Sequence, residues 1–283
     1  MIPTVAVIAS GAMGAGVGGR LTENGVTVLT MLKARSEASQ KRAAQAKMRD
    51  ASAAEIAAAD IVLSIIPPGQ AEALARELAP ALTAAAKKPV YADCNALNPE
   101  TKKEVGAIIA ATGCAYVDAG IVGPPPKPGS DHTRFYVAGP HSAAIMALNA
   151  YGLSVRDLGG AIGNAAALKM CYGAFNKGLT ALGSALALAA DRHGVADAFH
   201  AELALSQVAM LNQLNRTVPD MFPKAYRFVA EFDEVAAFVS GRPEQEMFRG
   251  IARLYQALAA DIDGPGREKA ALARFYAPPP GKT

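Results

Sequence analysis

The hydrophobic pattern changes character along the chain. Up to about residue 160, short apolar runs typical of strands buried on both faces alternate with longer alanine-rich helical runs. The expected strands are Val5–Ala9, Val26–Thr30, Ile61–Ile66, Val90–Asp93, Tyr116–Asp118 and Arg134–Val137. The expected helices between them are Met13–Asn24, Ser36–Met48, Gln70–Ala79 and Pro99–Thr112. This alternation predicts an α/β domain built on a doubly wound parallel sheet.

Beyond Gly160 the strand signals end and only helical patterns continue. Asn164–Asp191 is one long apolar helical stretch, and further patterns cover Ala198–Leu214, Tyr226–Val239 and Pro243–Ala260. Glycines gather in the segment Asp157–Gly163, which favours a boundary there. We therefore expect an α/β domain over residues 1–160 and an all-α domain over residues 161–283.

Composition and charge exclude several classes of protein. Hydrophobic residues make up 51% and charged residues 19% of the chain, which is too apolar for a disordered protein. The net charge is only +3 and no long basic run occurs, so we expect no nucleic-acid partner. The longest apolar stretch is shorter than the roughly 20 residues of a membrane span, and no basic signal-peptide start is present.

Three scattered cysteines, Cys94, Cys114 and Cys171, have no metal-ligand spacing. A disulfide scaffold or a metal site is therefore not expected, and a reducing compartment is the simpler interpretation. Together with the absence of targeting and membrane signals, this pattern predicts a cytoplasmic protein.

A glycine-rich turn follows the first expected strand and opens the first expected helix. The segment Ile8–Gly14 fits Gly-x-Gly-x-x-Gly with Ala9 in the first place. Small residues there allow a tight turn and close approach of the backbone to a pyrophosphate, and the helix start offers free N–H groups. The pattern predicts a Rossmann-type dinucleotide site, with a turn that binds no ligand as the alternative. The residues expected to bind the cofactor are Ser10, Gly11, Ala12, Met13 and Gly14.

The end of the second expected strand indicates which dinucleotide is preferred. An NAD site usually has an acidic residue there for the ribose diol. The segment after Thr30 has no acid but offers Lys33, Arg35 and Ser36, which suit a 2′-phosphate. We expect NADP rather than NAD, although NAD stays possible. The alternative is that these residues form a solvated face before the helix.

Five segments in order resemble one family. They are Ile8–Gly14, Ala59–Pro68, Asp93–Thr101, Asp118–Pro124, and Gly160–Gly163 followed by Lys169. The chain resembles the β-hydroxyacid dehydrogenases, which include 3-hydroxyisobutyrate and 6-phosphogluconate dehydrogenases. It is most similar to a less characterised branch with a phosphogluconate-dehydrogenase-like C-terminal domain. The resemblance implies a cofactor-lining role for Ile66, Pro67, Pro68 and Asn95, and a substrate loop at Val122, Gly123 and Pro124.

Lys169 is the predicted catalytic residue. It lies in an apolar helical stretch, where desolvation would lower the pKa of a lysine toward the working pH, as a general base requires. The resemblance places the family's catalytic lysine at the same position. The alternative is an ordinary helical lysine whose amine reaches solvent.

Three further residues are expected near a substrate. Tyr172 and Asn176 share the helical face of Lys169, at spacings of three and seven residues. Arg227 lies on a later helix where the family has a cleft-facing lysine, and it could bind a substrate carboxylate through two hydrogen bonds. The alternatives are helix packing for the first two residues and a surface pair with Glu231 for Arg227.

Departures from the family pattern keep other functions open. The family usually has Asn four residues after the lysine, where this chain has Gly173, and Val122 replaces the substrate-loop serine. Our first hypothesis is an NADP-dependent oxidoreductase that moves a hydride between the nicotinamide and a small β-hydroxyacid or related alcohol. The alternatives are an imine reductase and a non-catalytic NADPH-binding protein. We also expect a homodimer through the alanine-rich helical domain.

Overall fold

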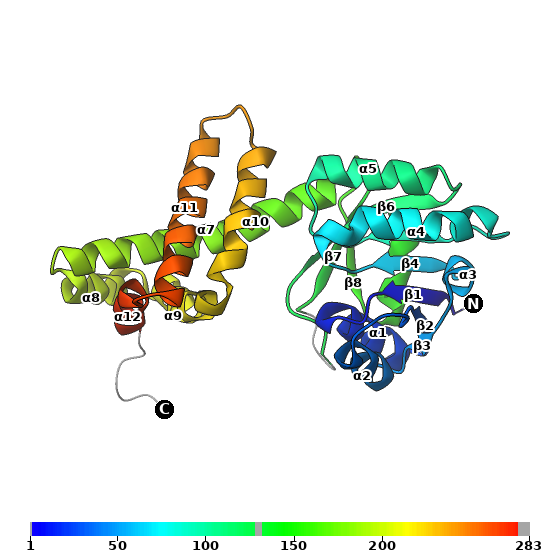
Figure 1. The fold of residues 1–283 in the computed structure, drawn as a ribbon, viewed down its shortest axis with the longest axis horizontal. Helices are drawn as coiled ribbons and strands as arrows, with labels where there is room; N and C mark the ends of the chain where they lie inside the picture. The colour runs from blue at the N-terminus through cyan, green and yellow to red at the C-terminus, as the bar shows by residue number, and fades with distance from the viewer. Residues whose placement is uncertain (1, 128–131, 277–283) are drawn as a thin grey trace. The chain divides into compact units, whose positions relative to one another are not determined.

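The computed structural model describes residues 2–127 and 132–276 of the chain. It divides into two compact units, Met1–Met170 and Cys171–Thr283 (Figure 1). The first unit contains the sheet, and the second is entirely helical among its described residues. The fold class predicted from the sequence, an α/β domain followed by helices, is confirmed.

The sheet of the first unit has eight strands in the order β3-β2-β1-β4-β5-β6-β7-β8. The strands are β1 (Thr4–Ile8), β2 (Thr27–Thr30), β3 (Arg49–Asp50), β4 (Ile61–Ser64), β5 (Val90–Asp93), β6 (Ala115–Val122), β7 (Arg134–Ala138) and β8 (Ser154–Asp157). The order of the first six is that of dinucleotide-binding folds. Their carboxyl ends therefore share one edge, where such folds bind ligands.

The sheet is not wholly parallel, which corrects the prediction. Strands β6 and β7 pair antiparallel, whereas every other neighbouring pair is parallel. The chain between Val122 and Arg134 is shorter than the dozen or so residues, usually helical, that a parallel crossover needs. The short edge strands β3 and β8 were not predicted.

Helices cover both faces of the sheet (Figure 1). They are α1 (Ala12–Glu23), α2 (Glu37–Gln45), α3 (Ala53–Ala57), α4 (Ala71–Ala84), α5 (Pro99–Ala110), α6 (Ala143–Met146) and the 3₁₀ turns η1 (Pro68–Gln70) and η2 (Ala147–Tyr151). Val5 and Val7 of β1 pack with α1, α2 and α6, while Ala6 and Ile8 pack with α3, α4 and α5. Alternate residues of β1 thus enter opposite cores, which explains why the strand is continuously apolar.

The second unit is built from helices of unequal length. They are the continuation of α7 (Asn164–Arg192), then α8 (Ala196–Ser206), α9 (Val208–Met221), η3 (Phe222–Lys224), α10 (Ala225–Phe238), α11 (Glu244–Asp263) and α12 (Arg267–Phe275). Helices α10 and α11 pack side by side through the rings of Phe228, Phe232 and Tyr255 (Figure 1). No helix among the described residues is long and apolar enough to cross a membrane.

One predicted helix is two helices. The pattern Ala198–Leu214 is interrupted at Gln207, whose backbone (φ −133°, ψ 42°) leaves the helical region. Neither Gly nor Pro marks the break, so local propensity does not reveal it. Helices α8 and α9, on the two sides of this residue, contact each other.

Candidate cofactor and catalytic site

The turn after β1 lies where the strand order reverses, since β1 has β2 on one side and β4 on the other. A Cβ on Gly14 would collide with the carbonyl oxygen of Ala9, so only glycine lets α1 start this close to the strand. A Cβ on Gly11 would meet nothing within 4 Å, so the side of the turn at Gly11 is open. Sequence and structure therefore agree on a close turn with open space beside it.

The start of α1 fits the phosphates of a dinucleotide. Gly11 is the N-cap residue and gives no side-chain hydrogen bond, and the first helical turn contains no acidic residue. The positive end of the helix dipole is therefore not neutralised by the helix itself. The hydroxyl of Ser10 is fully buried and has no hydrogen-bond partner among the described residues. A ligand in the turn would supply that partner.

Arg42 on α2 is a residue that the sequence reasoning missed. Its Nε donates to the carbonyl oxygen of Ser10 (3.0 Å), and its Nη2 donates to the hydroxyl of Ser39 (3.0 Å). These bonds hold a guanidinium against the nucleotide turn. The available signal was the density of basic residues between Lys33 and Arg49, which includes Arg42.

The loop after β2 contains the three residues predicted to select NADP. Lys33 is exposed, Arg35 is half-buried, and Ser36 is the N-cap of α2, its hydroxyl accepting from the N–H of Ser39 (3.3 Å). Asp50, at the end of β3, accepts from the N–H of Leu32 (2.9 Å) and so holds this loop. The two cations remain available at the carboxyl end of β2.

Asn95 connects the loops after β4 and β5. Its Oδ1 accepts from the N–H of Ile66 (2.7 Å), and its Nδ2 donates to the hydroxyl of Ser64 (2.9 Å). Pro67 and Pro68 follow directly and are exposed. The structure thus brings the predicted cofactor-lining residues together, and Asn95 fixes the loop through both ends of its amide.

Lys169 lies on the second turn of α7, directly above β6. Its Cβ is 3.3 Å from the position that a Cβ on Gly120 would take, and the carbonyl oxygen of Ala165 is 2.9 Å from the same position. Burial raises the pKa of the Cys94 thiol to about 12, and the ammonium groups of Lys102 and Lys169 oppose that shift. Lys169 is therefore within electrostatic reach of the carboxyl end of β5.

A buried ionic cluster beneath this position was not predicted. Lys102 on α5, Asp93 at the end of β5 and Asp118 on β6 have fully buried side chains. The Nζ of Lys102 lies 3.2 Å from Asp93 Oδ1 and 3.4 Å from Asp118 Oδ1. Tyr116 donates to Asp93 Oδ2 (3.3 Å), and burial, reinforced by the two carboxylates, raises the pKa of this tyrosine.

The predicted substrate loop begins at the end of β6. Val122 is buried, whereas Gly123 and Pro124 are exposed. Gly123 has a φ of +115°, and a Cβ there would collide with the carbonyl oxygen of His132, so this position requires glycine. The hydroxyl of Thr133 donates to the carbonyl oxygen of Pro124 (2.5 Å), which holds the two ends of the loop together.

Three predicted substrate residues belong to the second unit. Tyr172 is half exposed, and its carbonyl oxygen accepts from the side-chain amide of Asn176 (2.9 Å). Arg227 is exposed on α10. Its predicted surface partner, Glu231, instead pairs with Lys177 of α7, because the packing of α7 against α10 places that ammonium nearer.

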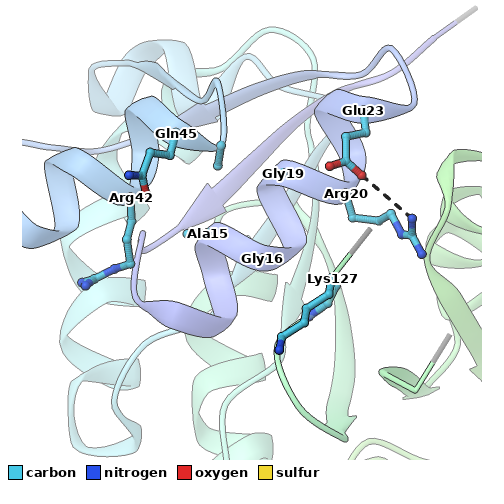
Figure 2. Close-up of a pocket in the computed structure, with 10 residues that line it drawn as sticks. Ala15, Gly16, Gly19, Arg20, Glu23, Arg42, Gln45 and Lys127 are labelled. Carbon is cyan, nitrogen blue, oxygen red and sulfur yellow. Dashed lines mark ion pairs between the residues drawn. The ribbon is translucent and has the colours of Figure 1, made fainter. Parts of the chain in front are cut away.

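A pocket of about 370 Å³ runs along α1 in the first unit (Figure 2). It lies between α1, α2 and the residues Pro126 and Lys127, and Arg42 is part of its lining. Arg20 and Glu23 on its wall form an ion pair at 3.9 Å. It adjoins the nucleotide turn but includes none of the site residues predicted from the sequence. The described residues contain no group of acidic, histidine or cysteine side chains that could hold a metal ion.

Three features are typical of a dinucleotide-binding protein: the strand order of the sheet, the glycine turn after β1 and the uncapped start of α1. Residues 4–148 match the NAD binding domain of 6-phosphogluconate dehydrogenase, and residues 190–258 match a domain of unknown function (DUF1932). The first match covers just over half of the chain, which therefore belongs to the family with this NAD-binding domain. The resemblance predicted from the sequence is confirmed. No curated protein matches the chain significantly.

Solved structures share the fold over nearly the whole chain. The conserved protein MTH1747, of unknown function and described as similar to 3-hydroxyacid dehydrogenases, is 26% identical; the alignment covers 92% of this chain and 98% of that one (TM-score 0.77). The 3-hydroxyisobutyrate dehydrogenase of Mycobacterium tuberculosis, solved with L-serine, is 21% identical, with 98% and 100% covered (TM-score 0.70). An imine reductase from Myxococcus stipitatus, solved with NADP⁺, is 20% identical, with 96% and 99% covered (TM-score 0.56).

Proposed function

We propose that the chain is an NADP-dependent oxidoreductase that transfers a hydride between the nicotinamide and a small β-hydroxyacid or related alcohol. The observation that carries the proposal is the placement of Lys169. Its helix lies directly on Gly120 of β6, toward the carboxyl edge of the sheet that also contains the nucleotide turn. An amine at that edge lies where the fold puts the reacting end of a dinucleotide.

The preference for NADP rests on charge at the end of β2. Lys33 and Arg35 offer two cations, and the segment from Thr30 to Ser36 has no carboxylate of its own. The carboxylate of Asp50, which reaches this loop, accepts from the N–H of Leu32. Arg42 adds a guanidinium held against the carbonyl oxygen of Ser10. The buried hydroxyl of Ser10 and the uncapped start of α1 would receive the pyrophosphate.

Lys169 would act on the proton of the substrate hydroxyl. When bound, NADP⁺ supplies the hydride acceptor. The neutral amine of Lys169 accepts the hydroxyl proton as the alcohol becomes a carbonyl, and in the reverse direction its ammonium returns that proton to the oxygen. The backbone of Gly123 and Pro124, fixed by Thr133, would shape the substrate side of the site.

The test is turnover with Lys169→Ala beside the unchanged protein. NADP⁺ reduction and NADPH oxidation would be measured with β-hydroxyacids, semialdehydes and cyclic imines, and repeated with NAD(H). We expect kcat for a hydroxyacid to fall by about 10²- to 10⁴-fold, the usual contribution of a general acid or base, with NADPH affinity unchanged.

Lys103→Ala is the matched control for this experiment. Lys103 is an exposed lysine of α5 paired with Glu100 (2.8 Å), so its removal should leave kcat unchanged. Hydroxyacid turnover that survives Lys169→Ala would contradict the proposal. NADPH binding without turnover of any of these compounds would favour the non-catalytic alternative.

The second candidate is a C=N reductase, favoured by Gly173. This position, four residues after Lys169, carries no side chain that could hold a hydroxyl or carboxylate of the substrate. The imine reductase of Myxococcus stipitatus has the same fold. Turnover of cyclic imines alone, indifferent to Lys169→Ala, is the result that would establish this function instead.

We further propose a homodimer formed through the helical unit. Tyr172, Phe175, Leu182 and Leu186 follow one another along α7 at helical spacing, and each is about half exposed or more. A row of large apolar side chains on one helix is typical of a surface that a protein partner covers.

A further inference from the structure

The buried ionic cluster connects α5, β5 and β6 to the helix that carries Lys169. Lys102, Asp93 and Asp118 are fully buried, and two carboxylates face one ammonium. Lys102 Nζ also donates to the carbonyl oxygens of Asp93 and of Ala119 (3.0 Å for the latter). Buried charges persist only where partners and hydrogen bonds replace water. One negative charge of this cluster therefore needs compensation from elsewhere.

The start of α7 supplies that compensation. Oδ2 of Asp118 accepts from the backbone N–H groups of Gly163 (2.9 Å), Ala165 (2.9 Å) and Ala166 (3.2 Å). These donors belong to the positive end of the helix and would otherwise lack intrahelical partners. The cap of α7 is thus a carboxylate from a strand far earlier in the chain, and its other oxygen faces Lys102.

Two residues of β6 determine where α7 lies. Asp118 caps its first turn, and Gly120, two residues on, lets the backbone of Ala165 approach the strand. Residues two apart on a strand point to the same face, so both contacts act on one side of α7. The next turn of the helix carries Lys169, whose Cβ meets the same glycine.

We propose that Lys102 is a positioning residue for Lys169. Its ammonium holds the Asp118 carboxylate in the orientation that caps α7, and the capped turn fixes the place of the Lys169 amine. The inference rests on the proposed function of Lys169, but its geometry is independent of any substrate. A purely structural ion cluster would add to stability and leave Lys169 in the folded protein untouched.

The test measures the chemical reactivity of Lys169 in the full-length protein. Lysines would be acetylated briefly with an N-hydroxysuccinimide ester in folded protein, and the rate at Lys169 would be read by mass spectrometry against exposed Lys87. The double variant Lys102→Met/Asp93→Asn removes one charge of each sign, which preserves the net charge of the cluster. Asp118→Asn keeps the side-chain size but removes the charge that caps α7.

We expect the rate at Lys169 to change by about fivefold or more in both variants, because a lysine's free-amine fraction and access follow its surroundings. Lys103→Met, which removes the exposed neighbour of Lys102, should leave the rate unchanged. An unchanged rate at Lys169 in the folded variants would overturn the proposal, even if their thermal midpoints fall. Should the double variant not fold, Asp118→Asn decides alone.

Failure of the proposed function is distinguishable from failure of this inference. The first appears as hydroxyacid turnover that survives Lys169→Ala, whereas the second appears as unaltered acetylation of Lys169. NADPH affinity, followed by its fluorescence, should stay within about twofold in Asp118→Asn, because the Asp118 carboxylate contacts the start of α7 and Lys102 rather than the nucleotide turn.

Discussion

The two units place polar and apolar side chains in opposite ways. In the first unit an ammonium and two carboxylates are wholly buried, and only Ile2 and Leu158 are large apolar residues with substantial exposure among those described. The described part of the second unit exposes nine such residues: Tyr172, Phe175, Leu182, Leu186, Val195, Leu205, Val208, Tyr226 and Met247. The buried polar groups of its core are hydroxyls rather than charges.

This difference suggests that one unit holds reacting groups in place and that the other makes contacts with a partner. Buried charges cost free energy and fix geometry, so their concentration below Lys169 fits a region whose groups must be held in place. Apolar side chains exposed to water cost free energy, and that free energy is regained when a partner covers them. Their concentration on the helices therefore fits a region that makes contacts. Each unit can therefore be perturbed separately by substitution.

The largest effect is expected from breaking the buried cluster. Lys102→Met leaves two buried carboxylates without their cation and should lower the free energy of unfolding by about 3–5 kcal/mol. Lys103→Met, one residue along the same helix but exposed, should change it by less than about 0.5 kcal/mol. Urea unfolding followed by circular dichroism measures both. Equal effects of the two substitutions would show that the cluster does not stabilise the first unit.

An intermediate effect is expected on the apolar surface of α7. Leu182→Lys puts a charge into the proposed contact and should raise the dimer dissociation constant by about 30-fold, or ~2 kcal/mol. Leu205→Lys on α8 is the matched control, because Leu205 is more exposed but lies outside the α7 row. Sedimentation velocity over a concentration series distinguishes them. A monomeric unchanged protein would contradict the dimer.

The smallest effect is expected from alkylating the thiols. Cys171 is exposed, whereas Cys94 is buried with a pKa of about 12 and so remains a protonated thiol at pH 8. Iodoacetamide should modify Cys171 alone in the folded protein and change its stability by less than about 0.5 kcal/mol. Peptide mass spectrometry reads the sites. Modification of Cys94 before unfolding would show that the interior of the first unit opens readily.

Local patterns predicted most of the fold. The strand Val90–Asp93 is where the apolar run placed it, and the glycine turn is recognisable because all its residues are adjacent in sequence. The edge strands β3 and β8 were not predicted, because they are short and partly exposed and no apolar run marks them. The break at Gln207 could not be predicted, because neither a glycine nor a proline marks it in the sequence.

The proposed catalytic residue, Lys169, could be selected from the sequence, whereas the buried cluster beside it could not. Lys102 and Lys103 are adjacent in sequence and identical in kind, yet one is fully buried and the other half exposed. Which of them faces the sheet depends on the rotation of α5 about its axis. The roles of Asp93 and Asp118 likewise depend on β5 and β6 being neighbours, which is a property of the strand order.

The long sequence separation between Asp118 and the turn it caps has a consequence for synthesis on the ribosome. Asp118 precedes Gly163 by 45 residues, so the strand that carries the acceptor leaves the ribosome well before the helix that needs it. When the first residues of α7 emerge, the Asp118 carboxylate that accepts from their N–H groups is already outside the ribosome. Strands β1 to β6 all precede α7 in the chain, so the carboxylate that caps the helix is synthesised before the helix itself.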